Sequence, residues 1–285
     1  MQKCRIIDGS LVAKQILDDL RVQVSEFKKA TNVTPSLIAI LVGQNSASQI
    51  YVNKKIKSCE DVGIKAGKIE INSDPELLST IQNINHDQTV HGCILQMPLP
   101  QGMNPNQYLS LISPEKDVDV FHPFNIGLLS QGKPYLKPCT PYGIQVLLKK
   151  NHISLSGKHV VIINRSNIVG KPLSLLMLQN DATVTVCHDK TSPELLKSIT
   201  KTADIVVVAV GIPNFLTPDM IRKGAGVIDV GINRLTGGKI VGDCHPDINT
   251  VAEWLTPVPG GVGPMTVAML LENTLNAAKR KLNYV

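Results

Sequence analysis

A tyrosine and a lysine lie four residues apart in the segment SQIYVNKKIKS, at Tyr51 and Lys55. The segment has helical character, and this spacing puts a phenol and an ammonium group side by side on one helix face. Such a pair can stack on a ring, donate hydrogen bonds and move a proton. Taken alone, it is more often the amphipathic side of a core helix, so the rest of the chain must decide between the two interpretations.

A second candidate site is the segment HVVIINRSNIVGKPLSLL, which reads as a strand, a short polar turn and a helix. Phosphate groups bind well at such a point, because backbone N–H groups and the positive end of a helix converge there. Arg165 and Ser166 stand in the turn, with Gly170 as its single glycine, so the GxGxxG pattern is absent. An ordinary turn with a solvated arginine is the competing interpretation.

The ends of the following strands also carry residues that suit a nucleotide. Asp189 lies at the tip of the next strand, where a carboxylate would accept hydrogen bonds from ribose hydroxyls and repel a 2′-phosphate. Arg165 and Lys190 would favour that phosphate. Gly211 ends the third strand of the series, and a ligand can approach the backbone of a glycine closely.

The elements that must position these residues alternate between apolar runs and helical patterns. In the first half, strands are expected at 36–43, 68–71 and 92–100, and helices at 11–29, 46–62 and 74–84, while a helix at 142–151 is expected to begin the second half. This order predicts right-handed crossovers and a parallel sheet. Residues 113–141 are rich in proline and are expected to form a functional loop or linker with little regular structure.

A second alternating series follows this loop. Its expected strands are 159–163, 182–186, 204–210 and 226–230, with the helices SLLMLQ, PELLKSI and PDMIRKG between them and a final helix at 264–281. The fold class predicted is α/β, with two domains that each hold a mostly parallel sheet with helices on both faces, the second being Rossmann-like. The predicted domains are 1–140, completed by the C-terminal helix 265–285, and 141–264.

Composition excludes several classes of protein. The chain is 43% hydrophobic and 18% charged, so it can bury a core. Aromatic residues make up only 4%, which argues against a surface that stacks on nucleic-acid bases. The net charge of +6 comes from scattered lysines, which indicates either a solvated surface or a field that attracts small anions. No signal peptide opens the chain and no apolar run could span a bilayer, so we expect a cytoplasmic protein without a membrane partner.

The cysteines show no CxxC spacing, and most lie in apolar runs. We therefore expect reduced, buried thiols and no metal site. The six are Cys4, Cys59, Cys93, Cys139, Cys187 and Cys244.

Five motifs together resemble the bifunctional methylenetetrahydrofolate dehydrogenase/methenyltetrahydrofolate cyclohydrolase family across essentially the whole chain. In chain order they are YVNKK (51–55), ILQMPLP (94–100), PEKDVDVFHP (114–123), NRSNIVGKP (164–172) and TPVPGGVGPMTVAML (256–270). The resemblance implies that the first domain faces a Rossmann-like NAD(P) domain across a cleft, and that the protein is a homodimer. It also implies oxidation of methylenetetrahydrofolate to methenyltetrahydrofolate with NADP, then hydrolysis to formyltetrahydrofolate, in one shared active site.

The resemblance assigns the chemistry to a few residues of the first domain. It makes Lys55 the catalytic lysine, Tyr51 the residue that stacks on the folate, and Gln96 the amide that hydrogen-bonds toward the lysine. Hydride removal needs no base, whereas hydrolysis needs proton handling, and a bound cation nearby would favour a neutral Lys55 that can take a proton from water. The substrate-binding residues implied are Asp119, Tyr51, Gly261 and Pro264.

The same resemblance implies NADP as cofactor, with NAD possible, because Asp189 and Arg165 argue in opposite directions. No metal is implied. The cofactor-binding residues expected are Asn164, Arg165, Ser166, Ile168, Asp189, Gly211, Ile232, Gly263 and Thr266.

Three positions depart from the family pattern. Asn164 stands where the family has glycine, and asparagine tolerates unusual backbone angles. Val120 stands where the family has a glycine after the pterin-binding aspartate. Valine disfavours a positive φ, so the backbone beside Asp119 is expected to differ there. Cys244 and His245 are also unusual, but two adjacent residues without partners do not make a metal site.

Two other functions are compatible with parts of the sequence. Short-chain dehydrogenases also carry a Tyr-xxx-Lys pair, but their nucleotide turn precedes the pair, whereas here the turn at 164–172 follows it. A nucleotide-binding regulatory protein with an inactive first domain is the other alternative, and the presence of Tyr51, Lys55, Gln96 and Asp119 together argues against it.

Overall fold

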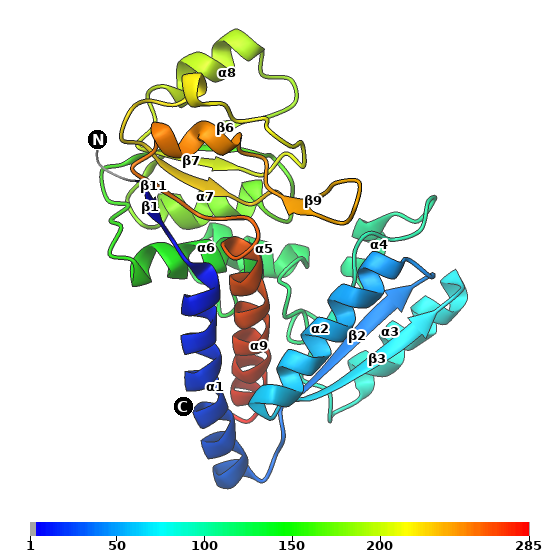
Figure 1. Ribbon diagram of the computed structural model, residues 1–285. Helices are drawn as coiled ribbons and strands as arrows, with labels where there is room; N and C mark the ends of the chain where they lie inside the picture. Colours follow the sequence, from blue (N-terminus) through cyan, green and yellow to red (C-terminus); the bar gives the residue numbers. More distant parts are fainter. Residues whose placement is uncertain (1–3, 285) are drawn as a thin grey trace. The chain divides into compact units, whose positions relative to one another are not determined.

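The computed structural model describes residues 4–284, which fold into two compact units (Figure 1). The six-stranded unit contains residues 4–13 and 140–266. The three-stranded unit contains residues 14–139 and 267–284. Both are built on parallel strands connected by helices, as the alternating pattern predicts.

The N-terminal segment differs from the predicted domain division, which placed it in the first domain. Strand β1 (Arg5–Ile6) instead joins the sheet of the six-stranded unit, where it pairs in parallel with β11 (Trp254–Leu255). The backbone N–H of Ile7 donates to the carbonyl of Leu255 at 2.9 Å. Two short strands that far apart in the sequence carry no periodicity that could reveal this pairing. The predicted positions 1–3 lie outside the described residues.

The three-stranded unit has its most buried strand at the centre. Strand β2 (Ser36–Val42) lies between β3 (Lys65–Ile71) and β4 (Gly92–Leu95), and both pairings are parallel. The continuous apolar run SLIAILV fits a strand that is covered on both faces. The carboxyl ends of β2 and β4 therefore lie at the same edge of the sheet.

Capping residues explain where helices of this unit begin and end, as α2 shows. Helix α2 starts after Asn45, whose side chain accepts the N–H of Ser48 at 3.0 Å, and ends at Gly63 in the left-handed conformation at φ 87°. Figure 1 shows α1 and α9 side by side, and Phe27 of α1 meets Tyr284 edge to face with ring centroids 5.3 Å apart. The helices are α1 (Gly9–Thr31), α2 (Ser46–Val62), α3 (Asp74–His86), α4 (Pro105–Leu109), α5 (Pro123–Ser130) and α9 (Val262–Lys281).

The segment 113–141 is more regular than its prolines suggested. Helix α5 lies within it, and Pro123 opens that helix at a position where the missing N–H is not needed. His122 precedes it as a cap, with its ring nitrogen accepting the N–H of Phe124 at 3.0 Å. Proline thus starts a helix here and does not prevent one.

The six-stranded unit has the strand order β1-β11-β8-β7-β5-β6, and every pair in that sheet is parallel. Chain order therefore reverses between β5 and β7, which is the point where doubly wound sheets bind their ligands. The segment PDMIRKG, expected as a helix, forms only a short 3₁₀ turn, η1 (Pro218–Met220), because a proline and a glycine bound it too closely. No helix in the described part of the chain could cross a membrane.

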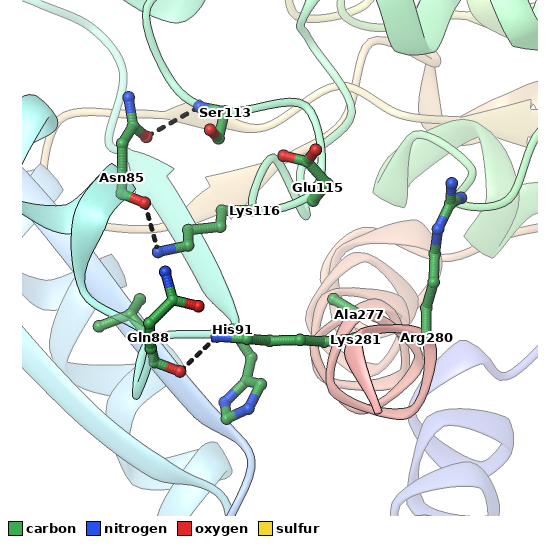
Figure 2. Close-up of a pocket in the computed structure, with 10 residues that line it drawn as sticks. Asn85, Gln88, His91, Ser113, Glu115, Lys116, Ala277, Arg280 and Lys281 are labelled. Carbon is green, nitrogen blue, oxygen red and sulfur yellow. Dashed lines mark hydrogen bonds between the residues drawn. The ribbon is translucent and has the colours of Figure 1, made fainter. Parts of the chain in front are cut away.

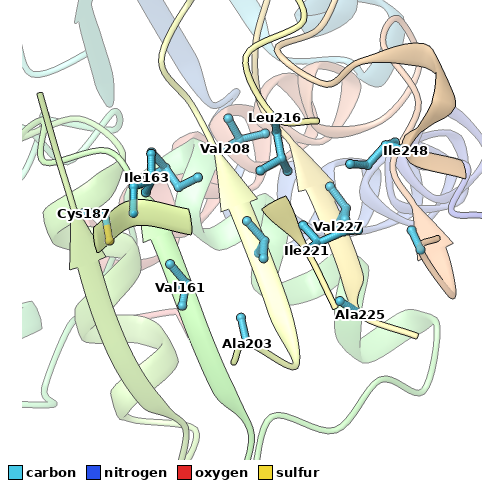
Figure 3. Close-up of a cluster of buried hydrophobic side chains, with 13 residues drawn as sticks. Val161, Ile163, Cys187, Ala203, Val208, Leu216, Ile221, Ala225, Val227 and Ile248 are labelled. Carbon is cyan, nitrogen blue, oxygen red and sulfur yellow. The ribbon is translucent and has the colours of Figure 1, made fainter. Parts of the chain in front are cut away.

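The remaining elements of this unit are β5 (His159–Ile163), β6 (Thr183–Cys187), β7 (Ile205–Val208), β8 (Gly226–Asp229), the hairpin β9 (Asn233–Arg234) with β10 (Ile240–Val241), α6 (Cys139–Lys150), α7 (Gly170–Leu178), α8 (Pro193–Thr200) and η2 (Pro246–Thr250). Figure 3 shows the aliphatic cluster on one face of this sheet, to which three neighbouring strands contribute Val161, Val208 and Val227 and the segments outside the strands contribute Leu216 and Ile248. This core fixes the strand ends relative to one another.

One glycine of this sheet allows a close contact that gives a test of the fold. Gly226 pairs with Trp254, and a Cβ at position 226 would lie 2.0 Å from the indole ring. We expect Gly226→Ala to destabilise the protein by about 1–3 kcal/mol, because the ring must move. Trp254 is the only tryptophan, so its fluorescence in denaturant unfolding reports on this contact directly.

The matched control is Gly127→Ala in α5, where the added methyl group meets nothing within 4 Å. It should be neutral or stabilising by up to about 1 kcal/mol, since alanine is the better helix former. Equal stability of the two variants would contradict the packing of Trp254 against Gly226.

Candidate functional site

The predicted lysine and glutamine meet in the three-stranded unit. The Nζ of Lys55 on α2 donates to Oε1 of Gln96 at 3.1 Å. Gln96 directly follows β4, and its own Nε2 donates to the carbonyl of Met97 at 2.6 Å, which turns the amide oxygen toward the lysine. Tyr51 lies one turn earlier on α2 and remains 38% exposed, so its ring is open to a ligand.

Asp119 belongs to the same cluster, as the buried thiol of Cys139 shows. Burial first, and then the nearby carboxylate of Asp119, raise the pKa of this thiol well above its usual value, while Lys55 acts in the opposite direction. Asp119 and Lys55 therefore lie around one thiol, although 64 positions separate them in the chain.

Two residues that sequence reasoning missed hold the backbone beside Asp119. The Nδ2 of Asn273 on α9 donates to the carbonyls of Val118 at 2.8 Å and Lys137 at 2.9 Å. The thiol of Cys139 donates to the same Val118 carbonyl at 3.3 Å. Nothing in the sequence distinguishes the buried Asn273 from the half-buried Asn276 one turn later.

The backbone at Val120 keeps a positive φ, although the stiff valine side chain led us to expect a different conformation there. It lies fully buried with φ at +63°, a left-handed conformation that glycine adopts freely and valine does not. The departure from the family pattern is thus accommodated as local strain. The carboxylate of Asp117 stabilises the turn that follows, because it accepts the N–H groups of Phe121 at 3.1 Å and His122 at 2.8 Å.

A cavity of about 400 Å³ lies at the other end of this sheet and holds none of the predicted residues (Figure 2). Lys116, which lines it, donates to the carbonyls of Ile84, Asn85 and Asp87 at 2.5, 3.0 and 2.6 Å. All three ammonium hydrogens thus satisfy the last turn of α3 and the residue after it. The role of Lys116 is to fasten α3 to the segment that leads to Asp119.

The six-stranded unit contains a larger cavity, of about 790 Å³, at the carboxyl ends of β5, β6 and β7. It lies at the point where the chain order of the sheet reverses. Four predicted cofactor residues line it, namely Asn164, Arg165, Ser166 and Asp189, and Gly211 sits between two lining residues. Ile168, Ile232, Gly263 and Thr266 are not among the lining residues.

The turn after β5 is organised by the side chain of Asn164. Its Oδ1 accepts the N–H of Ser166 at 2.8 Å, the hydroxyl of Ser166 at 2.7 Å and the N–H of Gly170 at 2.9 Å. Its Nδ2 donates to the carbonyl of Ala209, just after β7, at 2.6 Å. Asparagine is therefore accommodated at position 164 because its side-chain amide forms these hydrogen bonds. The same amide also occupies the N–H group of Gly170 at the start of α7, where N–H groups were expected to face a phosphate.

Arg165 and Asp189 form an ion pair beside the cavity. Lys190 adds a second cation, with its Nζ 3.6 Å from the other carboxylate oxygen of Asp189. Desolvation works against the charged form of Asp189, but the hydrogen bond from Arg165 and the charges of both cations hold its pKa below the usual value. The two residues that favour opposite cofactors thus neutralise one another.

The other predicted positions lie where the chain enters α9. Thr266 shares a hydrogen bond of 3.0 Å with the hydroxyl of Thr140. Gly261 is tightly enclosed, since a Cβ there would lie 2.5 Å from the carbonyl of Pro257, whereas Gly263 is open. Pro264 lies in the first turn of α9. Among the described residues, Cys244 and His245 join no group that could hold a metal ion.

A parallel sheet that reverses its strand order beside a cavity lined by an arginine and polar turn residues defines a Rossmann-like, dinucleotide-binding class of α/β protein. Two family models match the chain. Residues 7–119 match "Tetrahydrofolate dehydrogenase/cyclohydrolase, catalytic domain", and residues 138–282 match the NAD(P)-binding domain of the same family. The chain belongs to the tetrahydrofolate dehydrogenase/cyclohydrolase family.

Individual relatives agree over nearly the full length. The bifunctional protein FolD of Geotalea daltonii is 47% identical, with 97% of this chain and 99% of the relative covered. The crystal structure of the bifunctional enzyme FolD from Campylobacter jejuni has a TM-score of 0.94 at 45% identity, covering 98% of this chain and 99% of that one. Trypanosoma brucei FolD, complexed with NADP and an inhibitor, has a TM-score of 0.94 at 35% identity, with 99% of each chain covered.

The strain at Val120 predicts an unusual order of stability among substitutions. Alanine and glycine at position 120 both open a cavity, but only glycine relieves the left-handed backbone, which costs other residues about 1–2 kcal/mol. We therefore expect Val120→Gly to be at least as stable as Val120→Ala in urea unfolding. Val118, fully buried in the same segment, is the control, because there glycine should be less stable than alanine by about 0.5–1 kcal/mol. The same order at both positions would contradict the strain.

Proposed function

We propose that this protein oxidises methylenetetrahydrofolate to methenyltetrahydrofolate with NADP and hydrolyses the product to formyltetrahydrofolate. The observation that carries the proposal is the 3.1 Å hydrogen bond between Lys55 and Gln96, with Asp119 and Lys55 both near the thiol of Cys139. Family membership over nearly the whole chain supports the same reactions.

The first reaction removes a hydride from a methylene group held between two nitrogens. The resulting positive charge is shared by both nitrogens, so no catalytic base is required. NADP supplies the hydride acceptor, and the protein contributes binding and orientation. Tyr51 offers an exposed ring on which the folate can stack, and the carboxylate of Asp119 suits the amino and N–H donors of a pterin.

Hydrolysis requires a proton to leave the attacking water. Lys55 is the residue that can accept it, because a cationic substrate beside the amine favours the neutral form. Gln96 holds the Nζ of Lys55 through one hydrogen bond while its own NH₂ group is fixed on Met97. The hydrogen-bond partner that aims the amine is thereby a neutral amide, which favours the ammonium form less than a carboxylate in that place would.

NADP is supported by the cavity of the six-stranded unit. Arg165 can present a guanidinium fork to a 2′-phosphate once it releases Asp189. Because Asp189 is already paired with two cations, its repulsion of that phosphate is weakened, and the carboxylate acts chiefly as a competitor for Arg165. The residues present therefore fit NADP, and NAD use depends on how strongly Asp189 retains the arginine.

The alternatives carry less support. A short-chain dehydrogenase would place its nucleotide turn before the tyrosine and lysine, whereas here the pair lies on α2 and the turn between β5 and α7 comes later in the chain. A purely regulatory nucleotide-binding protein would have no use for an oriented Lys55–Gln96 pair. We also infer a homodimer, on the family resemblance, and a cytoplasmic location, which six free thiols support.

Lys55→Met tests the division of labour between the two reactions. It should lower the rate of methenyltetrahydrofolate hydrolysis by about a hundredfold or more, as expected for loss of a general base, and leave most of the dehydrogenase rate. Both rates are measured on the same preparation, and Lys54→Met, an exposed neighbour on α2, is the control. Equal losses in both reactions would show that Lys55 serves binding and not hydrolysis.

The competition for Arg165 gives a second test. Asp189→Ser should raise kcat/KM for NADP, because the arginine is released, and leave kcat/KM for NAD unchanged or lower. Arg165→Ala should reduce activity mainly with NADP, by about 1.5–3 kcal/mol in transition-state binding. Equal losses with both cofactors would make Arg165 a structural residue or a contact of the pyrophosphate, and would remove the main support for NADP.

A further inference from the structure

A fully buried carboxylate lies behind the cavity of the six-stranded unit, at Asp243. Its Oδ2 accepts the backbone N–H groups of Val210 at 2.6 Å and Gly211 at 3.0 Å. Its Oδ1 accepts the N–H of Ile212 at 3.0 Å and the side-chain Nδ2 of Asn233 at 2.8 Å. Four donors converge on one side chain, and three of them come from consecutive residues of a single loop.

That loop leaves β7 at the point where the strand order reverses, and it forms part of the cavity wall. Val210 and Ile212 line the cavity, and Gly211 between them has φ at +70°. On the other side, Asn164 holds the carbonyl of Ala209 at 2.6 Å. The loop is therefore held at two places. Asn164, which follows β5, donates to one carbonyl of the loop, and the carboxylate of Asp243 accepts three of its N–H groups.

Asp243 is itself held in place by a second buried carboxylate. Asp229, at the end of β8, accepts the backbone N–H of Asp243 at 2.9 Å and that of Cys244 at 2.9 Å. Among the described residues neither aspartate takes part in a salt bridge, and the donors to Asp243 are three backbone N–H groups and one side-chain amide. Burying a carboxylate without a cation is costly, and such an arrangement indicates that the geometry it enforces matters.

We propose that Asp243 is a positioning residue for the dinucleotide: its carboxylate fixes the Val210–Ile212 loop in the shape that binds NADP. It touches no reacting atom and acts through the backbone of this loop. The inference rests on the proposed function, because it assumes that the cavity holds the cofactor.

The test is Asp243→Asn. The new amide replaces one carboxylate oxygen by an NH₂ group, which cannot accept the two hydrogen bonds that this oxygen receives. The dissociation constant for NADPH, followed by its fluorescence, should rise about tenfold or more, as expected for the loss of charged hydrogen bonds. The KM for NADP should rise with it, while the rate of methenyltetrahydrofolate hydrolysis without cofactor stays within about twofold. A purely structural role would instead lower both activities together.

The control is Asp204→Asn at the opposite end of the same sheet. Asp204 accepts the N–H of His159 at 2.8 Å and pairs with Arg222, far along the strands from the cavity. It should lower the unfolding temperature and leave NADPH affinity unchanged. Equal NADPH affinity of wild type and Asp243→Asn would overturn the inference, whereas failure of the wild type to bind NADPH would overturn the proposed cofactor instead.

Should Asp243→Asn not fold, amide hydrogen exchange of the wild type without cofactor answers the same question. The amides of Val210, Gly211 and Ile212 should exchange slowly, because Asp243 holds them before any ligand binds. Exchange at the rate of an unstructured loop would overturn the inference.

Discussion

The position of Gln96 at the carboxyl end of β4 is the constraint on which the chemistry of the three-stranded unit depends. Parallel pairing aligns Ile40 with Leu95, and the backbone N–H of Gln96 then donates to the carbonyl of Ile40 at 2.9 Å. A shift of one residue would turn Gln96 to the other face of the sheet and leave Lys55 without its partner. In the observed register, residues 37–40 of β2 pair with residues 92–95 of β4 at four consecutive positions.

Both units use the same device at their functional ends, which is a buried or half-buried polar side chain that holds the backbone of a loop. Asn273 holds the carbonyl beside Asp119, Asn164 joins the ends of β5 and β7, and Asp243 gathers three consecutive N–H groups. The residues that can meet a ligand, such as Tyr51 and Arg165, are partly exposed and stand on this fixed backbone. Orientation of the ligands is thus built into loops that hydrogen bonds hold rigid.

The sequence predicts the elements whose signals are local. Helix α2 begins at Ser46 and ends at Val62 as expected, because Asn45 caps it and Gly63 stops it, and β5 follows its apolar run from 159 to 163. The Lys55–Gln96 contact is also confirmed, although motif resemblance and not periodicity placed it.

What the sequence does not predict depends on partners distant in the chain. Strand β1 has only two residues, too few to show a pattern, and it is a strand only because it pairs with β11 some 250 positions later. The roles of Asn273 and Asp243 are invisible for the same reason, since an asparagine in a helix and an aspartate after a short strand look like surface residues until the fold brings loops to them. Val120 was misjudged because the surrounding contacts outweigh its own backbone preference.

The central claim is that Lys55, aimed by a neutral amide, accepts the proton during hydrolysis. The most direct test is the pH dependence of methenyltetrahydrofolate hydrolysis by Gln96→Glu. This change places a carboxylate beside the Nζ of Lys55, which is 3.1 Å from the present amide oxygen, and a negative charge there favours the ammonium form. The rate at neutral pH should fall, and the rising limb of the profile should move to higher pH while the plateau is largely retained. A profile with its rising limb unmoved would contradict the account, because the proton would then be taken by a group that does not sense Gln96.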